Sequence, residues 1–171
     1  LAEWKWDGIR VQIIISKNKT VIFSRTGEEI SHSFPDINFS SKDNVVIDGE
    51  LLVGRNCIPE TFNDLQQRLN RKNVSKEKIK LHPAFVKVYD ILFFNDQDQR
   101  NKDFVIRRKI LESWFKENKQ KNLDISSMIL FDSWEQLKEI KISSTRKNFK
   151  HEGIMLKLKK SKYLSGRPKG F

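Results

Sequence analysis

Apolar residues form four long runs in the first hundred residues of the chain, and β-branched and aromatic side chains dominate each run. That composition is typical of strands that are buried on one or both faces. The polar tetrapeptide Ser16-Lys17-Asn18-Lys19 separates the first two runs and indicates a hairpin turn. The pattern therefore predicts strands at residues 9–15, 20–24, 45–53 and 84–94.

Helical spacing of apolar residues predicts three helices. In the stretch 61–71, one Phe and two Leu recur at helical intervals, and Thr61 is a candidate N-cap. Residues 104–118 carry the broad apolar face of an amphipathic helix. A third helix is expected to begin after Ser133.

Two shorter strands complete the pattern, at residues 128–131 and 153–159. Strands and helices follow one another without the regular alternation of βαβ units, and the sequence has no internal repeat. The sequence therefore predicts an α+β fold with mainly antiparallel sheet and flanking helices.

Composition narrows the class of protein. The length of 171 residues suits one domain with a hydrophobic core, or one part of a larger protein. Hydrophobic residues make up 37% of the chain and include 12 Phe and 4 Trp, which excludes a disordered chain. The single cysteine, Cys57, cannot form an internal disulfide, so we expect a reducing compartment.

The chain is strongly basic, because 33 Lys and Arg outnumber 22 Asp and Glu and give a net charge of +11. A domain with this charge is expected to meet a polyanion: nucleic acid, nucleotide phosphates or an anionic membrane surface. A solvated basic surface is the other explanation. No apolar run approaches the ~20 residues that span a bilayer, and we expect no signal peptide. We therefore expect a cytoplasmic protein without a membrane partner, associated with the nucleoid if it is bacterial.

The segment Lys5-Trp6-Asp7-Gly8-Ile9-Arg10 contains the parts of an activated amine. Free lysine has a pKa near ~10.4, so a nucleophilic lysine must be partly desolvated or lie beside other cations. Trp4 and Trp6 can supply apolar walls, and Arg10 can bind a phosphate or a sugar. An exposed lysine on a turn explains the segment equally well.

The tripeptide Asp48-Gly49-Glu50 places two carboxylates inside an apolar strand. Such carboxylates cost free energy unless they are paired, hydrogen-bonded or bound to a metal. Both side chains are expected on one face of the sheet, because side chains alternate along a strand. A simple backbone bend is the alternative, and it would be favoured if this segment stood alone.

The last candidates are an aromatic residue and a basic run. Tyr89, in the strand 84–94, can stack on a planar base, although such a tyrosine is more often part of the core. Glu152 precedes the last predicted strand, and the basic run that follows suits phosphate contacts or is a solvated face. The basic residues of the run are Lys157, Lys159, Lys160, Lys162, Arg167 and Lys169.

Taken in order, four elements of the chain resemble the successive motifs of the covalent nucleotidyltransferases: the ATP-dependent DNA ligases, RNA ligases and mRNA capping enzymes. The elements are Lys-x-Asp-Gly-x-Arg, Asp-Gly-Glu, aromatic-Asp-Ile-Leu and Glu-Gly-Ile-Met-x-Lys. Linking segments such as residues 23–27, 33–37 and 65–69 look like the DNA ligase branch, and the first motif looks closest to small bacterial-type ligases. The resemblance extends from Lys5 to the basic loop 161–170.

The resemblance implies a role for each residue at these motif positions. Lys5 would attack the α-phosphate of ATP and carry AMP as a phosphoramide. Tyr89 would stack on adenine, with Glu3 beside the adenine amino group. Mg²⁺ or Mn²⁺ would lie at Glu50 and Glu152. Arg10 would contact the ribose or a phosphate of the nucleotide, and Glu50 would hold the ribose. The other implied nucleotide contacts are Arg25 at the nucleotide or a 5′-phosphate, Lys157, and Arg167 or Lys169 in a loop where Pro168 interrupts the usual basic pattern.

The resemblance also implies a fold and a domain organisation. The fold would be the ATP-grasp-like catalytic core of DNA ligases and capping enzymes. An aromatic-rich motif with alternating lysines, and a C-terminal OB-fold domain, would follow Phe171. Residues 1–171 are therefore expected to be an adenylation domain that lacks both ends and has little or no activity alone.

The implied function is the sealing of nicks in duplex DNA by a monomer that uses ATP and Mg²⁺. An RNA ligase or a capping-type enzyme is the alternative within the same class. A non-catalytic nucleic-acid-binding module, argued from the charge of +11, is the alternative of a different class.

Overall fold

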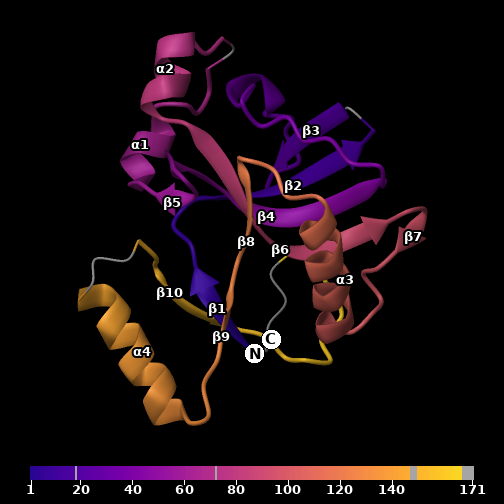
Figure 1. The fold of residues 1–171 in the computed structure, drawn as a ribbon, viewed down its shortest axis with the longest axis vertical. Coiled ribbons are helices and arrows are strands. Elements are labelled where there is room, and N and C mark those ends of the chain that lie inside the picture. Colours follow the sequence, from indigo (N-terminus) through magenta and orange to yellow (C-terminus); the bar gives the residue numbers. More distant parts are fainter. Residues whose placement is uncertain (18, 72, 147–149, 167–171) are drawn as a thin grey trace.

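The computed structural model describes residues 1–17, 19–71, 73–146 and 150–166, which form two sheets with helices around them (Figure 1). The strands are β1 (Ala2–Lys5), β2 (Ile9–Ser16), β3 (Lys19–Ser24), β4 (Val45–Arg55), β5 (Ile58–Pro59), β6 (Ala84–Phe94), β7 (Gln97–Asp98), β8 (Leu123–Ile125), β9 (Met128–Ile129) and β10 (Gly153–Leu156). The helices are α1 (Phe62–Gln66), α2 (Lys76–Leu81), α3 (Phe104–Glu117) and α4 (Trp134–Arg146), with a 3-10 turn at Ser31–Ser33.

The larger sheet has the strand order β3-β2-β4-β6-β7, all antiparallel, with β5 beside β4 and β8 parallel to β6. The smaller sheet has the order β10-β1-β9 and is antiparallel. The predicted α+β fold with mainly antiparallel sheet is therefore confirmed. No helix within the described ranges is long and apolar enough to cross a membrane.

The main core lies between the larger sheet and the elements that pack on one of its faces. Alternate residues of β2 are fully buried, as the period of a strand requires. Leu111 and Trp114 of α3 enter the same core, and α3 lies across β6 (Figure 1). Each such side chain contributes about 1.5–3 kcal/mol by burial, so these side chains stabilise the packing of α3 against this sheet.

The helix predicted over 61–71 is only the short α1. Its N-cap is confirmed, because Thr61 and Asp64 exchange hydrogen bonds in a capping box. Arg68, two residues after the helix, is completely buried and binds Asp36 at 2.5 Å. A buried charge pair therefore holds this segment where a longer helix was expected.

The last strand is also shorter than predicted, because β10 ends at Leu156 and not at residue 159. Beyond β10 the chain leaves the sheet and runs beside the first turn of α3. There the backbone N–H groups of Phe104 and Val105 donate to the carbonyls of Ser161 and Lys159. Lys157 and Lys159, which the predicted strand 153–159 included, therefore lie outside the strand.

Candidate active site

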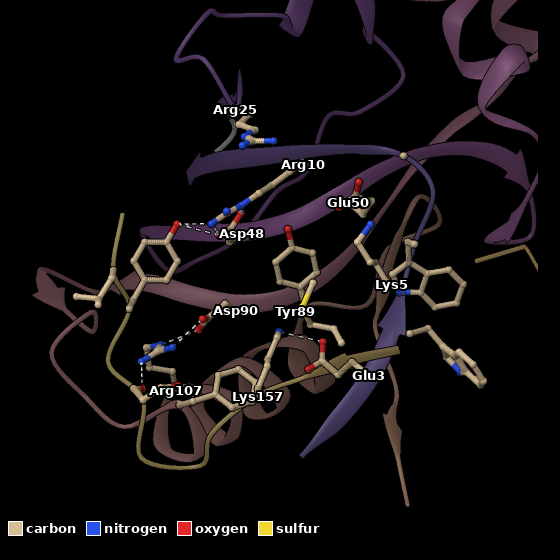
Figure 2. Close-up of a pocket in the computed structure, with 18 of the residues that line it drawn as sticks. Glu3, Lys5, Arg10, Arg25, Asp48, Glu50, Tyr89, Asp90, Arg107 and Lys157 are labelled. Carbon is tan, nitrogen blue, oxygen red and sulfur yellow. Dashed lines mark hydrogen bonds and ion pairs between the residues drawn. The ribbon is translucent and has the colours of Figure 1, made fainter. Parts of the chain in front are cut away.

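A pocket with a volume of about 720 Å³ lies where the two sheets meet. Strands of both sheets line it, together with the first turn of α3 and the segment 161–166 (Figure 2). The pocket brings together eight of the nine residues to which the sequence assigns a role: Glu3, Lys5, Arg10, Arg25, Glu50, Tyr89, Glu152 and Lys157. Arg167, like Lys169 and Pro168, lies outside the described residues.

Lys5 is the last residue of β1, and its ammonium group forms an ion pair with the carboxylate of Glu152. The backbone brings the pair together, since the N–H of Glu152 donates to the carbonyl of Lys5 at 2.7 Å. Both side chains remain about half exposed, at 49% and 44%. Lys5 therefore lines the pocket as a half-exposed side chain that is paired with Glu152.

Gly8 explains how the chain turns from β1 into β2 beside this pair. A Cβ atom at Gly8 would lie 2.5 Å from the carbonyl oxygen of Leu51 and 2.7 Å from a methyl carbon of Leu52. Contacts that short do not occur, so the turn passes β4 at a distance that only glycine allows. This close approach puts Lys5 and Arg10, on either side of the turn, into one pocket.

Asp48 and Glu50 point from β4 into the pocket, two residues apart on one face of the strand. Burial and the charge of Asp48 raise the pKa of Glu50 to about 8, although Arg10 and Lys5 lower it. Glu50 therefore needs a cation or a hydrogen-bond donor in order to be ionised at neutral pH. Figure 2 shows Glu50 close to Lys5 at one end of the pocket.

Arg10 lies at the other end of the pocket and binds Asp48 through two nitrogens (Figure 2). Its Nε and Nη2 atoms lie 3.1 Å and 2.6 Å from the two carboxylate oxygens. The hydrogen bonds to Asp48 raise the pKa of Arg10 further, so Arg10 is a permanent cation. Asp48 is the fully buried carboxylate of the tripeptide, and its charge is paired with that of Arg10, a residue of the first motif.

Tyr89 forms the floor of the pocket from β6, with Lys157 beside its ring. The Lys157 ammonium lies 4.7 Å from the ring centroid and donates to Glu3 at 3.1 Å. Glu3 is 2% exposed and also accepts a hydrogen bond from Arg108 at 3.2 Å. Burial raises the pKa of Glu3, and these two cations counteract the rise. Glu3 is thus already held by two cations, which the sequence did not predict.

Sequence reasoning missed a second buried pair, Asp90 with Arg107. The Arg107 Nε and Nη2 atoms lie 2.8 Å and 2.9 Å from the Asp90 carboxylate oxygens, and both side chains are under 9% exposed. Arg107 lies near the start of an amphipathic helix, where an arginine is usually solvated. The sequence did contain a signal: Asp90 lies inside an apolar strand, and a buried carboxylate there needs a cation as partner.

Arg25 is exposed in the turn after β3, at the rim of the pocket. The described residues contain one group of three metal-ligating side chains whose ligand atoms lie within 4.8 Å of one another, and it is Glu60, Asp64 and His82. None of the three lines the pocket, and the α1 capping box and an Arg55 ion pair engage the two carboxylates. A cation at the pocket would instead find Glu50 and Glu152 beside Lys5.

Comparison with known proteins gives a consistent result. A family model described as "ATP dependent DNA ligase domain" matches residues 1–170. DNA ligase 2 of Methanosarcina acetivorans is 31% identical over 173 residues, which cover 96% of this chain and 30% of that protein. The DNA ligase of Archaeoglobus fulgidus is 30% identical with the same coverage. The chain therefore spans about a third of the length of these relatives.

The fold has a close counterpart among solved structures. A mycobacterial DNA ligase D complexed with ATP and MES superposes with a TM-score of 0.74 at 20% identity. The match covers 97% of this chain and 50% of that one. The two-sheet arrangement around the pocket is thus a known architecture, as the resemblance implied.

Proposed function

Since this chain belongs to the family of ATP-dependent DNA ligase domains, we propose that it is the adenylation unit of an enzyme that seals nicks in duplex DNA. The observation that supports this proposal most strongly is the pocket itself. One lysine, two carboxylates beside it and a fixed arginine come together from three distant parts of the sequence. A nucleic-acid-binding module has no use for that arrangement.

The first step joins AMP to Lys5. The neutral amine of Lys5 attacks the α-phosphorus of ATP, an N–P bond forms, and the bond from phosphorus to the leaving pyrophosphate breaks. The Lys5 ammonium gives one proton to solvent before the attack, and the nitrogen gives up a second proton as the phosphoramide forms. Glu152 forms an ion pair with the Lys5 ammonium and so keeps the nucleophile in the pocket before ATP binds.

A divalent cation fits the residues at this end of the pocket. Glu50 and Glu152 both flank Lys5, and the raised pKa of Glu50 marks a carboxylate that lacks a sufficient cation. Such carboxylate oxygens are ligands that Mg²⁺ and Mn²⁺ accept. When bound, Mg²⁺ would act as a Lewis acid and neutralise part of the negative charge on the phosphates of ATP.

The other pocket residues bind and orient the nucleotide. We propose that Arg10 contacts the ribose or a phosphate and that the Tyr89 ring stacks on adenine, because both residues line the pocket. The Lys157 ammonium lies over the Tyr89 ring and donates a hydrogen bond to Glu3, so charged groups border the proposed site for adenine. These groups bind substrate, whereas Lys5 reacts with it.

Two further steps complete the proposed reaction. AMP passes from Lys5 to the 5′-phosphate of a nick, and the 3′-hydroxyl then attacks that phosphate and releases AMP. The net charge of +11 favours a DNA duplex as partner, and the exposed Arg25 at the rim suits the 5′-phosphate. We propose that an OB-fold domain elsewhere in the polypeptide closes on the DNA, and that the protein acts as a cytoplasmic monomer.

Nick sealing tests the proposal in the longest natural polypeptide that contains residues 1–171, called the native polypeptide below. The protein, ATP and Mg²⁺ are incubated with a 5′-phosphorylated nick in duplex DNA, and the sealed strand is measured on a denaturing gel. We expect sealing of DNA and poor sealing of the same nick in RNA. Efficient sealing of RNA alone would favour an RNA ligase. Failure on both substrates, with no lysyl-AMP by intact mass, would favour the binding module.

A further inference from the structure

The segment that follows β10 is fastened to the wall of the pocket. Its carbonyls at Lys159 and Ser161 accept hydrogen bonds from the free N–H groups of the first turn of α3. The side chain of Arg107 also donates to the Ser161 carbonyl, at 3.1 Å. The backbone N–H of Tyr163 donates to the carbonyl of Arg100 at 2.9 Å. These bonds leave the Tyr163 side chain over the Arg10 end of the pocket.

The Tyr163 hydroxyl uses all of its hydrogen-bonding capacity there. It donates to Asp48 at 2.9 Å, and it accepts from Arg10 Nη2 at 2.7 Å and from Gln12 Nε2 at 3.1 Å. Burial and the charge of Asp48 raise the pKa of Tyr163 to about 12, so the phenol keeps its proton at neutral pH. Residues 10, 48 and 163 therefore form one closed hydrogen-bonded unit.

This unit engages only part of the Arg10 guanidinium. Asp48 and Tyr163 bind Nε and Nη2, while Nη1 has no hydrogen-bond partner within the described part of the chain. The Arg10 side chain is still 40% exposed, and it lines the pocket. Arginine loses much rotamer freedom when it is fixed, and a group that is fixed beforehand pays less of that cost when a ligand arrives.

We propose that Tyr163 is a positioning residue, whose hydroxyl holds Arg10 in the orientation in which its remaining nitrogen binds ATP. The inference rests on the proposed function, because Arg10 must be a nucleotide contact for the orientation to matter. The role also links the segment after β10 to nucleotide binding: when the segment is docked on α3, Arg10 is fixed.

Tyr163→Phe in the native polypeptide tests this role, because it removes the hydroxyl and keeps the ring. Lysyl-AMP formation is followed by intact mass at a series of ATP concentrations. We expect the KM for ATP to rise roughly three- to tenfold, the size of one lost hydrogen bond, with the maximal rate within about twofold of wild type. The melting temperature is measured beside it and is expected to stay within a few degrees.

A double-mutant cycle separates positioning from a merely structural effect. Lysine at position 10 keeps the charge but cannot form the two-nitrogen contact with Asp48. In the Arg10→Lys background, Tyr163→Phe should therefore change the KM by less than about twofold. Gln12→Met is the matched control, since it removes a hydrogen bond to the same hydroxyl and keeps the hydrogen bonds that join Arg10, Asp48 and Tyr163, and we expect the wild-type KM.

Each contrary outcome has a distinct meaning. An unchanged KM in Tyr163→Phe, or a rise of equal size in the Arg10→Lys background, would overturn the role of Tyr163 while the proposed function stands. A rise of equal size in Gln12→Met would show a general loosening of the segment and would also overturn it. If wild-type protein formed no lysyl-AMP, the proposed function would fall and the inference with it.

Discussion

The two ends of the pocket are built differently, although both are lined by charged residues. At one end, Lys5 is half exposed and forms an ion pair with Glu152, which is exposed to a similar extent. At the other end, Arg10 is bound by two atoms of a buried aspartate and by Tyr163. The buried pair of Asp90 and Arg107 lies beside that end (Figure 2).

The exposed Lys5 and the fixed Arg10 suit different proposed roles, which are nucleophilic attack and nucleotide binding. A nucleophile must exchange its ion-pair partner for a phosphorus atom, so a tight buried network around Lys5 would oppose the reaction. A binding group works best when its orientation is fixed before the ligand arrives. Substitutions of the half-exposed Lys5 and Glu152 should therefore affect chemistry and leave stability alone, whereas substitutions at the Arg10 end should affect binding and stability.

The largest effect is expected at Lys5. Lys5→Ala should reduce lysyl-AMP formation more than about 1000-fold, because no other group can replace the nucleophile. Lys5→Arg should fail as well, since a guanidinium stays protonated. The melting temperature of both variants should equal that of wild type, because the side chain is half exposed. A large loss of stability in either variant would contradict the division between the two ends.

Arg107→Met should have the largest effect on stability. It leaves Asp90 as an uncompensated buried charge, which typically costs about 3–5 kcal/mol in the free energy of unfolding, measured by urea denaturation. Arg100→Met is the matched control, because its partner Asp98 lies on the surface, and we expect no measurable change. Equal stabilities of the two variants would show that the Arg10 end is not held by its buried pairs.

The carboxylates beside Lys5 should control the use of metal. Glu152→Gln and Glu50→Gln should each raise the Mg²⁺ concentration for half-maximal adenylation on the order of tenfold, because each removes a candidate ligand. Glu152→Gln should keep the wild-type melting temperature, since Glu152 is half exposed. Unchanged metal dependence in both variants would mean that the two residues serve the structure only.

A smaller effect is expected from the pH dependence of stability without metal. The pKa of Glu50 is raised from 4.5 to about 8, so the folded state holds this proton more tightly than the unfolded state. The contribution of Glu50 to the free energy of unfolding of the wild-type protein therefore falls as the pH rises from 4.5 to 8. In EDTA, Glu50→Gln should match wild type near pH 4 and be more stable at pH 8 by roughly 1–2 kcal/mol, after allowance for solvent screening. Equal stability at both pH values would contradict the burial argument.

The sequence predicted the parts of this molecule that depend on local pattern. The strand at 84–94 and the helix from Phe104 have the boundaries that apolar runs and helical spacing indicate. Short elements were missed, because the few residues of β1, β5, β7, β8 and α2 carry too little pattern. The end of β10 was predicted wrongly, because hydrogen bonds to α3, more than fifty residues away in the chain, decide it.

The candidate site also has residues that the sequence predicted and residues that it did not. Residues of the four motifs could be chosen from the sequence because their order along the chain is distinctive, and the fold brings them to one pocket. The residues that bind these motif residues could not be identified from the sequence. Tyr163 reaches Asp48 and Arg10 across separations of 115 and 153 residues, and nothing local in its basic segment marks it. The roles of the motif residues remain predictions until they are measured.

The most direct test of the central claim is to locate AMP on the protein. The native polypeptide is incubated with ATP and Mg²⁺, its intact mass is measured, and the modified peptide is identified by fragmentation. Acidic conditions are avoided during digestion, since a phosphoramide is acid-labile. The account predicts the addition of a single AMP, carried by Lys5. AMP on another lysine, or no addition while the protein remains folded, would contradict it.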